Sequence, residues 1–392
     1  MRICVIGAYP PEKYGVGVYT RDLVRSLKEI DPSLEITILS RVYNGPNTLD
    51  GARVLRVIDT SRPLFFLSLL GQILRIRPDI AHVQHEYYAF GGTSNLNTAL
   101  FVVLMRLCFV PLVVTMHEVY RTPELSARSR WKALARYLLF KIQTLLICRC
   151  STSMIVHTEL SKTVLERQFS AKQVMVIPHG TRTSVPRLSS DEAKKALHLE
   201  GRKVVMSFGS LRPGKGLEYA IESMAIVTKR LSEAVLILAG DLAPGYRGYL
   251  EQISNLSHGL GVADSVVFTG RYVEEEELPL YFSAADAIIL PYLGQFRSGS
   301  GVLHLAASYG KPVVASDVGE AAEVLRRCAG GMLVPQADSI SLADALTTLL
   351  LDEPGRAKMG LDLQKYVISS SSWRITADAT LKTYRNSVRR RG

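Results

Sequence analysis

Cysteine is scarce in this chain of 392 residues, and its distribution argues against domains stabilised by disulfides or by zinc. The five cysteines are an odd number, and their spacing fits no metal-ligand pattern. Disulfide frameworks and structural zinc sites need cysteines that are paired or closely spaced. We therefore expect no disulfide framework, no zinc site and a reducing compartment.

The sequence also lacks an apolar run long enough to cross a membrane. The longest run, residues 99–116, is interrupted by Arg106 and Pro111 and is shorter than the ~20 apolar residues of a transmembrane helix. The first residues, MRICVIGAYPP, have one basic residue and no small-residue cleavage pattern, so we expect no signal peptide. These absences favour a cytoplasmic protein.

Positive charge is in excess in the first half of the chain and at its C-terminal end. Residues 1–180 carry 22 Lys and Arg against 13 Asp and Glu, residues 181–364 carry 18 against 22, and residues 365–392 carry 7 against 1. The sum is a net charge of +11. Such asymmetry favours an anionic partner, for example a phospholipid surface or a nucleic acid.

Strand-like and helix-like segments alternate along both halves of the chain, which is typical of parallel α/β sheets. Apolar strand-like runs occur at residues 2–7, 35–39, 80–84, 112–116 and 153–157. After a polar linker near residues 181–200, further runs occur at 202–209, 234–238, 265–268, 287–290 and 312–315. The sequence predicts two Rossmann-like domains, residues 1–180 and 181–364, which face each other across a ligand-binding cleft.

A basic loop separates the first strand and the first helix of the second half. In FGSLRPGKGLEYAIES, Arg212 and Lys215 are two cations, and Gly214 and Gly216 allow close approach of the backbone to a ligand. Two such cations can neutralise a diphosphate. A solvated basic turn is the alternative that the spacing leaves open.

A run of small residues precedes a predicted helix that begins near Val302. Ser298, Gly299, Ser300 and Gly301 would expose N–H donors at the helix N-terminus, where an anion can bind. A helix N-cap with a flexible loop accounts for the same residues. Because the basic loop lies in the same half, the two features together favour a ligand that carries phosphate.

These motifs, in their order along the chain, resemble glycosyltransferase family 4, whose members are retaining enzymes of the GT-B fold. Four segments of the chain resemble the donor-binding domain of that family: FGSLRPGKGL, VVFTGRYVEEEELPLYFSAADAIILPY, SGSGVLHLAASYGKPVVASDVGEAAEVL and IPHG. Three further segments resemble its acceptor-binding domain: VIGAYPPEKYGVGVYTRDLVRSL, DIAHVQHEYYAFGG and PLVVTMHEV. SSSWRITADATLKTYRNSV resembles the closing helix of the family, so residues 365–392 are expected to complete the first domain.

The resemblance implies transfer of a sugar from a nucleotide diphosphate sugar to an acceptor hydroxyl, in glycan, polysaccharide or glycolipid synthesis. It implies that Arg212 and Lys215 bind the donor diphosphate and that His117 lies near the reacting centre. Further donor contacts are implied for Gly15, Gly270, Arg271, Tyr272, Ser298, Gly299, Ser300, Gly301 and Val302. No cofactor and no metal are expected, because cations and amides would supply the positive potential.

The sequence departs from the family pattern at two places. The usual pair of glutamates is absent, because Arg297 and Leu305 take their positions, and the tripeptide SGV at 300–302 matches a subset of the family. The glutamate that normally holds the ribose is therefore missing. The usual Gly-Gly pair of the first loop is Tyr14-Gly15, and Tyr14 is expected to narrow the acceptor side.

Two alternatives to sugar transfer remain open. One is an epimerase or phosphorylase on the same scaffold, and the other is a degenerate homologue that binds a nucleotide without transferring a sugar. The lost glutamate pair motivates the second. His82 and His85 have the residue types of a metal site, but their place at a strand end favours a structural or cleft-lining role.

Residues 128–149 predict an amphipathic basic helix. This segment carries six Lys and Arg and no acidic residue, and its apolar residues recur at helical spacing, at Trp131, Leu134, Leu138, Ile142 and Leu145. An apolar stripe that faces the core explains the pattern equally well. We favour peripheral contact with an anionic surface at the inner face of the membrane, a glycan or lipid-linked acceptor, and no nucleic-acid partner.

Overall fold

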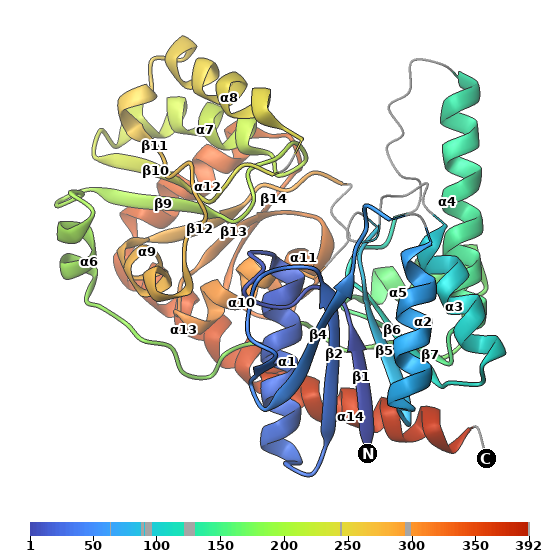
Figure 1. Ribbon diagram of the computed structural model, residues 1–392. Coiled ribbons are helices and arrows are strands. Elements are labelled where there is room, and N and C mark those ends of the chain that lie inside the picture. Colours follow the sequence, from blue (N-terminus) through green and yellow to red (C-terminus); the bar gives the residue numbers. More distant parts are fainter. Residues whose placement is uncertain are drawn as a thin grey trace. The chain divides into compact units, whose positions relative to one another are not determined.

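Strands form where runs of Val, Ile and Leu are bounded by polar or glycine-containing loops, and they assemble into two sheets (Figure 1). The computed structural model describes residues 1–62, 64–87, 90, 96–120, 130–243, 245–294 and 299–390. The chain divides into two units. The first comprises Met1–Gly180, Arg297–Gly299 and Trp373–Gly392, and the second comprises Thr181–Phe296 and Ser300–Ser372.

The first unit holds an eight-stranded sheet in the order β3-β4-β2-β1-β5-β6-β7-β8. All neighbouring strands are parallel except β3 and β4. The strands are β1 (Arg2–Ile6), β2 (Glu35–Arg41), β3 (Thr48–Leu49), β4 (Ala52–Ile58), β5 (Ile80–His85), β6 (Leu112–Met116), β7 (Ser153–Val156) and β8 (Val174–Val176). The predicted parallel α/β sheet is confirmed for this half of the chain.

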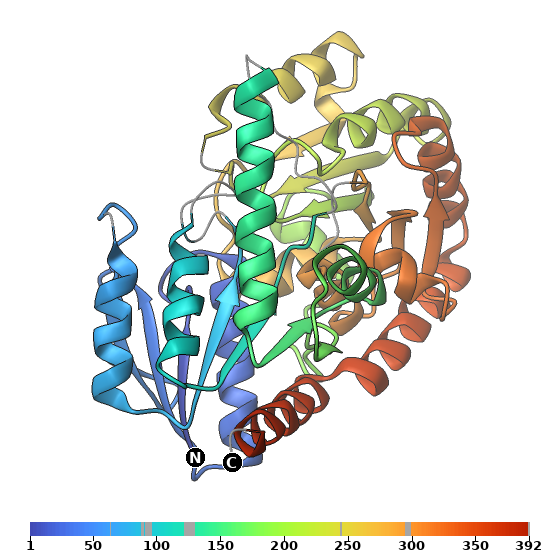
Figure 2. The same cartoon turned by 90° about the vertical axis from the view of Figure 1, so that its right-hand side faces the viewer.

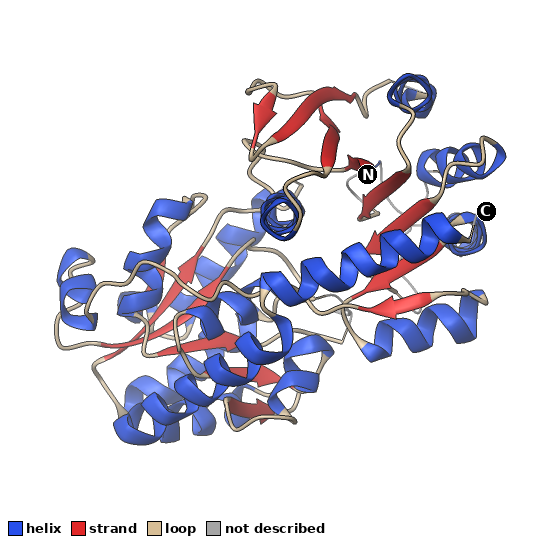
Figure 3. Cartoon of the chain, turned by 90° about the horizontal axis from the view of Figure 1, so that it is seen from below, coloured by secondary structure: helices blue, strands red, loops and turns tan. Residues whose placement is uncertain are grey.

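Helices cover both faces of this sheet, and the C-terminal helix is one of them. They are α1 (Gly15–Ile30), α2 (Phe65–Ile76), α3 (Asn97–Leu107), α4 (Arg130–Cys150), α5 (Glu159–Phe169) and α14 (Trp373–Arg389). Helix α14 packs beside α1 and against β5 and β6, as Figure 3 shows. It buries Leu381 and Tyr384 in the core. Sequence analysis expected residues 365–392 to complete the first domain. Residues 365–371 instead belong to the preceding helix, α13 (Glu353–Ser371), which lies in the second unit.

The second unit holds a six-stranded parallel sheet in the order β11-β10-β9-β12-β13-β14. Its strands are β9 (Lys203–Phe208), β10 (Ala234–Ala239), β11 (Val266–Phe268), β12 (Ala287–Leu290), β13 (Val313–Ser316) and β14 (Gly331–Val334). Its helices, besides α13, are α6 (Ser190–Ala196), α7 (Leu217–Arg230), α8 (Arg247–Gly259), α9 (Leu278–Ala284), α10 (Gly301–Ser308), α11 (Gly319–Leu325) and α12 (Ser339–Leu351). The second predicted α/β domain is thus also confirmed as a parallel sheet.

The polar stretch that sequence analysis treated as a linker contains helix α6. Ser189 caps this helix: its side chain accepts a hydrogen bond from the Glu192 N–H, and the Glu192 side chain accepts from the Ser189 N–H. This reciprocal capping box satisfies two backbone donors that a helix N-terminus leaves unpaired. The Ser-x-x-Glu spacing that carries this signal lies within the linker and was overlooked.

Candidate functional site

The loop after β9 lies where the strand order of the second sheet reverses. Strand β9 lies between β10 and β12. From β9 the chain builds the sheet to one side, through β10 and β11, and then to the other side, through β12, β13 and β14. In open α/β sheets, ligands bind at the carboxyl ends of strands at such a switch point. The loop that carries Arg212 and Lys215 begins there, between β9 and α7.

Gly216 allows this loop to press against the loop that follows β12. Its φ of 66° is a left-handed conformation, and a Cβ added there would lie 1.8 Å from the Pro291 carbonyl oxygen. A hydrogen bond from the Leu293 N–H to the Gly214 carbonyl, 3.1 Å long, joins the same two loops. The position of Lys215 is therefore fixed by its neighbours on both sides.

Tyr292 brings the cations and the small-residue turn together. The Lys215 ammonium lies 4.1 Å from the centroid of the Tyr292 ring. Burial raises the pKa of Tyr292 to about 12, while the side chain of Ser300 and the positive charge of Arg212 act in the opposite direction. Arg212, Lys215 and Ser300, which sequence analysis proposed as donor-binding residues, therefore surround one buried tyrosine.

The turn at Ser300 is held from inside the protein by an acidic side chain. The Ser300 N–H donates to Oε2 of Glu320 over 2.5 Å, and the Ser300 hydroxyl caps α10 by accepting from the Leu303 N–H over 3.3 Å. Sequence analysis expected the amides of this turn to face phosphate. The Ser300 amide instead already has a carboxylate partner. Gly301 and Val302 begin α10, and Ser298 lies outside the described residues.

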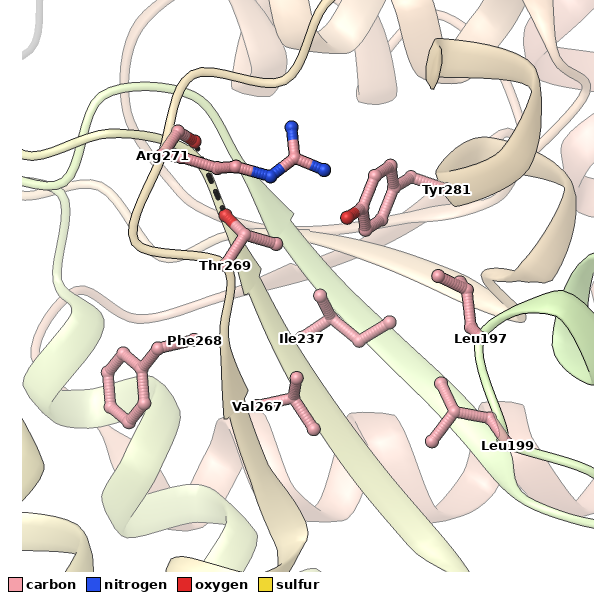
Figure 4. Close-up of a pocket in the computed structure, with 8 residues that line it drawn as sticks. All are labelled: Leu197, Leu199, Ile237, Val267, Phe268, Thr269, Arg271 and Tyr281. Carbon is pink, nitrogen blue, oxygen red and sulfur yellow. Dashed lines mark hydrogen bonds between the residues drawn. The ribbon is translucent and has the colours of Figure 1, made fainter.

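The loop of residues 270–272 borders a cavity of about 220 Å³ between β10, β11 and the end of α6 (Figure 4). Its lining is mostly apolar, with Thr269 and Arg271 as polar members and neither Arg212 nor Lys215 among them. Arg271 forms an exposed ion pair with Glu277, with nitrogen to oxygen distances of 2.5 and 2.7 Å. This cavity is therefore separate from the basic loop after β9.

In the first unit, His117 follows strand β6 and is nearly fully buried. Its Nε2 lies 2.8 Å from the side-chain oxygen of Gln84, and its ring meets Tyr19 edge to face with centroids 4.7 Å apart. Burial, followed by the neighbouring histidines, lowers the pKa of His117 well below 6.5. His117 is therefore a neutral imidazole at neutral pH.

Sequence analysis missed His157 and His179, which lie beside His117. The ring centroid of His157 is 5.2 Å from that of His117 and 6.0 Å from that of His179. Trp373, the first residue of α14, closes the group with its ring 5.5 Å from His179. One signal was available, because His117 and His157 each directly follow an apolar parallel strand and such strand ends share one edge of a sheet.

His82 and His85 are buried in the core, as expected from their place on a strand. His82 bonds to the Tyr384 hydroxyl over 2.6 Å and to the Thr115 hydroxyl over 2.7 Å. His85 stacks on Phe90 with centroids 6.1 Å apart. Burial lowers the pKa of each to about 3. Within the described ranges, no group of three His, Cys, Asp or Glu side chains is arranged to hold a metal ion.

Tyr14 and Gly15 lie between β1 and α1. A Cβ added at Gly15 would meet no atom within 4 Å, so the chain has open space on that side. The Tyr14 hydroxyl donates to Glu86, which follows β5, and the Arg41 guanidinium lies 5.6 Å from the Tyr14 ring centroid. Tyr14 is therefore fixed by neighbours at the carboxyl edge of the first sheet. From the sequence, Glu86 was considered only beside His82 and His85 as a possible metal ligand, and not as a partner of Tyr14.

Both halves of the chain match known protein families. Residues 14–185 match the model for Glycosyltransferase Family 4, and residues 202–352 match the model for Glycosyl transferases group 1. The two matched regions lie in the first and the second unit respectively, apart from the first few residues after Gly180.

Curated relatives are similar to the chain over part or nearly all of its length. A GDP-mannose-dependent alpha-(1-6)-phosphatidylinositol monomannoside mannosyltransferase of Mycobacterium tuberculosis is 32% identical over 187 residues, which are 46% of this chain and 47% of that protein. The match therefore spans about half the length of that relative. A D-inositol 3-phosphate glycosyltransferase of Paenarthrobacter aurescens is 26% identical over 95% of this chain and 93% of its own.

Solved structures share the fold over almost the entire chain. Sucrose-phosphate synthase from Thermosynechococcus elongatus superposes with a TM-score of 0.80 at 21% identity and covers 98% of both chains. Anabaena HepE, in complex with UDP-glucose, has a TM-score of 0.76 at 17% identity over 98% of this chain and 100% of its own. At these identities the likeness establishes the fold.

Proposed function

Because the chain belongs to the two-domain GT-B glycosyltransferases of family 4 and group 1, we propose that it transfers a sugar from a nucleotide diphosphate sugar to an acceptor hydroxyl with retention of configuration. The observation that carries this proposal is the pair Arg212 and Lys215. Both lie on one loop at the switch point of a parallel sheet, around buried Tyr292. Fixed cations at such a position suit a diphosphate leaving group.

The proposed chemistry needs no covalent intermediate on the protein. The bond between the anomeric carbon and the donor phosphate oxygen breaks, and the acceptor oxygen bonds to that carbon on the same face. The acceptor proton passes to the departing phosphate oxygen. Arg212 and Lys215 stabilise the charge that develops on the diphosphate, and neutral His117 lies near the reacting centre.

The test is to incubate the full chain with UDP- and GDP-sugars, with and without glycan or glycolipid acceptors, and to follow the products by mass spectrometry. Transfer that needs an acceptor, with slow donor hydrolysis in its absence, supports the proposal. Conversion of the donor into an isomer without acceptor would instead support an epimerase. Nucleotide binding with neither reaction would support the degenerate homologue.

We further propose that the first unit docks on an anionic membrane surface, which would suit a lipid-linked acceptor. Within the described residues, no helix is both long and apolar enough to span a bilayer. Helix α4, however, turns an apolar stripe outward: Trp131 is 80% exposed, and Leu134, Leu138 and Ile142 are also exposed. Its core side is formed by Phe140, Thr144 and Ile147 instead. The core-facing interpretation of the stripe is therefore wrong for these four residues.

Neighbouring elements extend this surface. Helix α3 packs between α2 and α4, and Leu107 and Phe109 at its end are exposed. Figures 1 and 2 both show α4 projecting beyond the end of the first sheet. The exposed cations on the same helices are Arg75, Arg106, Lys132, Arg136, Lys141 and Arg149. A basic surface with protruding apolar side chains suits an anionic lipid leaflet.

A further inference from the structure

The segment IPHG, residues 177–180, is the last part of the first unit before the chain enters the second. Two of its carbonyl oxygens accept hydrogen bonds from other elements. His157, at the end of β7, donates from Nδ1 to the Ile177 carbonyl over 2.9 Å. The Thr376 hydroxyl of α14 donates to the Pro178 carbonyl over 3.1 Å. The segment is therefore held between the end of a strand and the C-terminal helix.

Gly180, which ends this segment, lies directly against the ring of Trp373, the first residue of α14. A Cβ added at Gly180 would lie 2.1 Å from Cδ2 of Trp373, so a larger residue would displace the ring. The chain leaves the first unit after Gly180, and its C-terminal part re-enters that unit at Trp373. The Thr181 N–H donates to the Ser371 carbonyl over 2.7 Å. The outgoing and the returning segments of the chain therefore lie side by side.

Tyr19 of α1 contacts four rings at this place. Its ring centroid lies 4.7 Å from that of His117, 5.3 Å from that of His157, 5.1 Å from that of His179 and 5.1 Å from that of Trp373. The Tyr19 side chain is buried. Edge-on and tilted ring contacts favour particular relative orientations. One buried tyrosine thus links the first turn of α14 to the imidazole of His117.

The orientation of His117 depends on such ring contacts. One hydrogen bond, between Nε2 and the Gln84 side-chain oxygen, holds a single atom of the imidazole. The tilt of the ring about that atom is limited by its neighbours, among them Tyr19 and His157. Because Tyr19 also packs on Trp373, removal of the Trp373 ring would leave Tyr19 free to shift away from His117.

Packing of the core is the alternative role for these rings. Tyr19 and Trp373 belong to an apolar cluster that also holds Leu381 and Tyr384 of α14. If packing were the whole role, any large-to-small substitution in the cluster would lower stability and leave the chemistry of the folded protein unchanged. Packing alone, however, does not call for imidazoles around Tyr19, because burial of polar groups costs free energy.

We propose that Tyr19 and Trp373 are positioning residues that hold the His117 imidazole in its working orientation, so that helix α14 completes the site of the first unit. The proposal rests on the proposed function, because it takes His117 to lie near the reacting centre of sugar transfer. Tyr19 acts on His117 by direct contact. Trp373 acts through Tyr19, and Gly180 provides the space that the Trp373 ring needs.

The test is to compare the kinetics of sugar transfer by variants of the full chain. Trp373→Leu removes the ring and keeps an apolar side chain, so kcat should fall about two- to tenfold, with a smaller change in the KM for the donor. Trp373→Phe keeps a smaller ring and should recover most of this loss. Gly180→Ala displaces the ring without removing it. This variant should reproduce the Trp373→Leu pattern, and it provides the comparison if Trp373→Leu fails to fold.

Two matched controls separate positioning from stability. Leu381→Ala truncates a buried side chain of the same helix and the same apolar cluster, so it should lower thermal stability and leave kcat unchanged. Gly71→Ala adds a Cβ on α2 that meets no atom within 4 Å, and should leave kcat unchanged. Equal kcat values for Trp373→Leu and Leu381→Ala would overturn the proposal.

A second measurement does not depend on activity. The exchange of the C2 hydrogen of each imidazole for deuterium, followed by mass spectrometry of peptides, is sensitive to the surroundings of that ring. The His117 rate should rise in Trp373→Leu and in Gly180→Ala, and should stay at the parent value in Leu381→Ala. An unchanged His117 rate in Trp373→Leu would overturn the proposal whatever the activity. Absence of transfer by the parent chain, with the expected exchange rates, would instead overturn the proposed function.

Discussion

Nε2 of His157 lies 3.3 Å from Nδ1 of His117, so the imidazoles that follow the neighbouring strands β6 and β7 face each other at close range. Nδ1 of His157 lies 2.9 Å from the Ile177 carbonyl oxygen, which only accepts, so this nitrogen carries a proton. The Gln84 side-chain oxygen also only accepts, so neutral His117 carries its proton on Nε2. The two facing nitrogens, Nε2 of His157 and Nδ1 of His117, then both lack a proton in the neutral rings. Gln84 therefore fixes the tautomer of His117, and the His157 ring limits its orientation.

Replacement of His157 tests this positioning role. His157→Ala should lower kcat about two- to tenfold, the loss expected when one neutral side-chain contact that orients His117 is removed, with a smaller change in the KM for the donor. The pH profile of kcat should also shift to higher pH, because the His157 imidazole is one cause of the lowered pKa of His117. His258→Ala on the exposed part of α8 is the control. Equal kinetics and pH profiles for the two variants would contradict the role.

Loss of either cation of the basic loop should weaken donor use. Arg212→Ala or Lys215→Ala removes a charge-assisted contact worth about 1.5–3 kcal/mol, so kcat/KM should fall about tenfold to hundredfold. Lys229→Ala, at the exposed end of the helix that follows the loop, should leave the kinetics unchanged. Wild-type kinetics in both loop variants would remove these residues from the donor site.

Gly216 should tolerate no side chain. Gly216→Ala places a Cβ against the Pro291 carbonyl in a left-handed backbone conformation, so we expect a loss of at least about 2 kcal/mol in the free energy of unfolding. Gly248→Ala is the matched control, because a Cβ there meets no atom within 4 Å. Denaturant titrations of both variants measure the difference, and a Gly216→Ala protein as stable as the control would refute the close approach.

Buried histidines should make the protein sensitive to acid. The pKa of His85 is about 3 in the folded chain, against about 6.5 when unfolded. Only the unfolded state therefore takes up a proton as the pH falls below about 6.5, and stability is lost from that pH down to the folded pKa. At pH 5 the cost is about 2 kcal/mol for one such residue.

His85→Phe removes this contribution. Both ring nitrogens of His85 are buried without a hydrogen-bond partner among the described residues, so the substitution leaves no new unpaired group. The free energy of unfolding, measured by denaturant titration, should fall about 2 kcal/mol less between pH 7.5 and pH 5 than it does for the parent chain. An identical pH dependence for variant and parent would contradict the neutral burial of His85.

Membrane docking through α4 should depend on both its apolar stripe and lipid charge. We expect flotation of the parent chain with anionic vesicles at low salt, and loss of flotation with neutral vesicles or at high salt. Trp131→Ser combined with Leu138→Ser should abolish it. Ile340→Ser, a comparably exposed apolar residue on α12, should not. Flotation that ignores lipid charge and salt would argue against this surface.

Local patterns in the sequence predicted much of this protein. The predicted apolar runs match β1, β2, β5, β6 and β7 of the first sheet and β9 to β13 of the second, whereas β3, β4, β8 and β14 were not predicted. The inward face of α1 follows the helical spacing of Val16, Tyr19, Leu23 and Leu27. The basic loop with Arg212 and Lys215 was recognisable because two cations and two glycines lie within a few residues between a strand and a helix. Such features depend on neighbours in sequence, so their physical cause is present in the segment itself.

Only the tertiary structure decided which helix faces are exposed and which residues from distant segments come into contact. The apolar stripe of α4 fits a core or a surface equally well, and only the packing of α3 against its other face turns Trp131 outward. His157 reaches His117 because strands β6 and β7 are adjacent in the sheet. Glu320 reaches Ser300 because β12 and β13 are adjacent and their following loops meet. These contacts arise when whole sheets assemble, since hydrogen-bond partners in a buried network are selected by position in space and not by spacing along the chain.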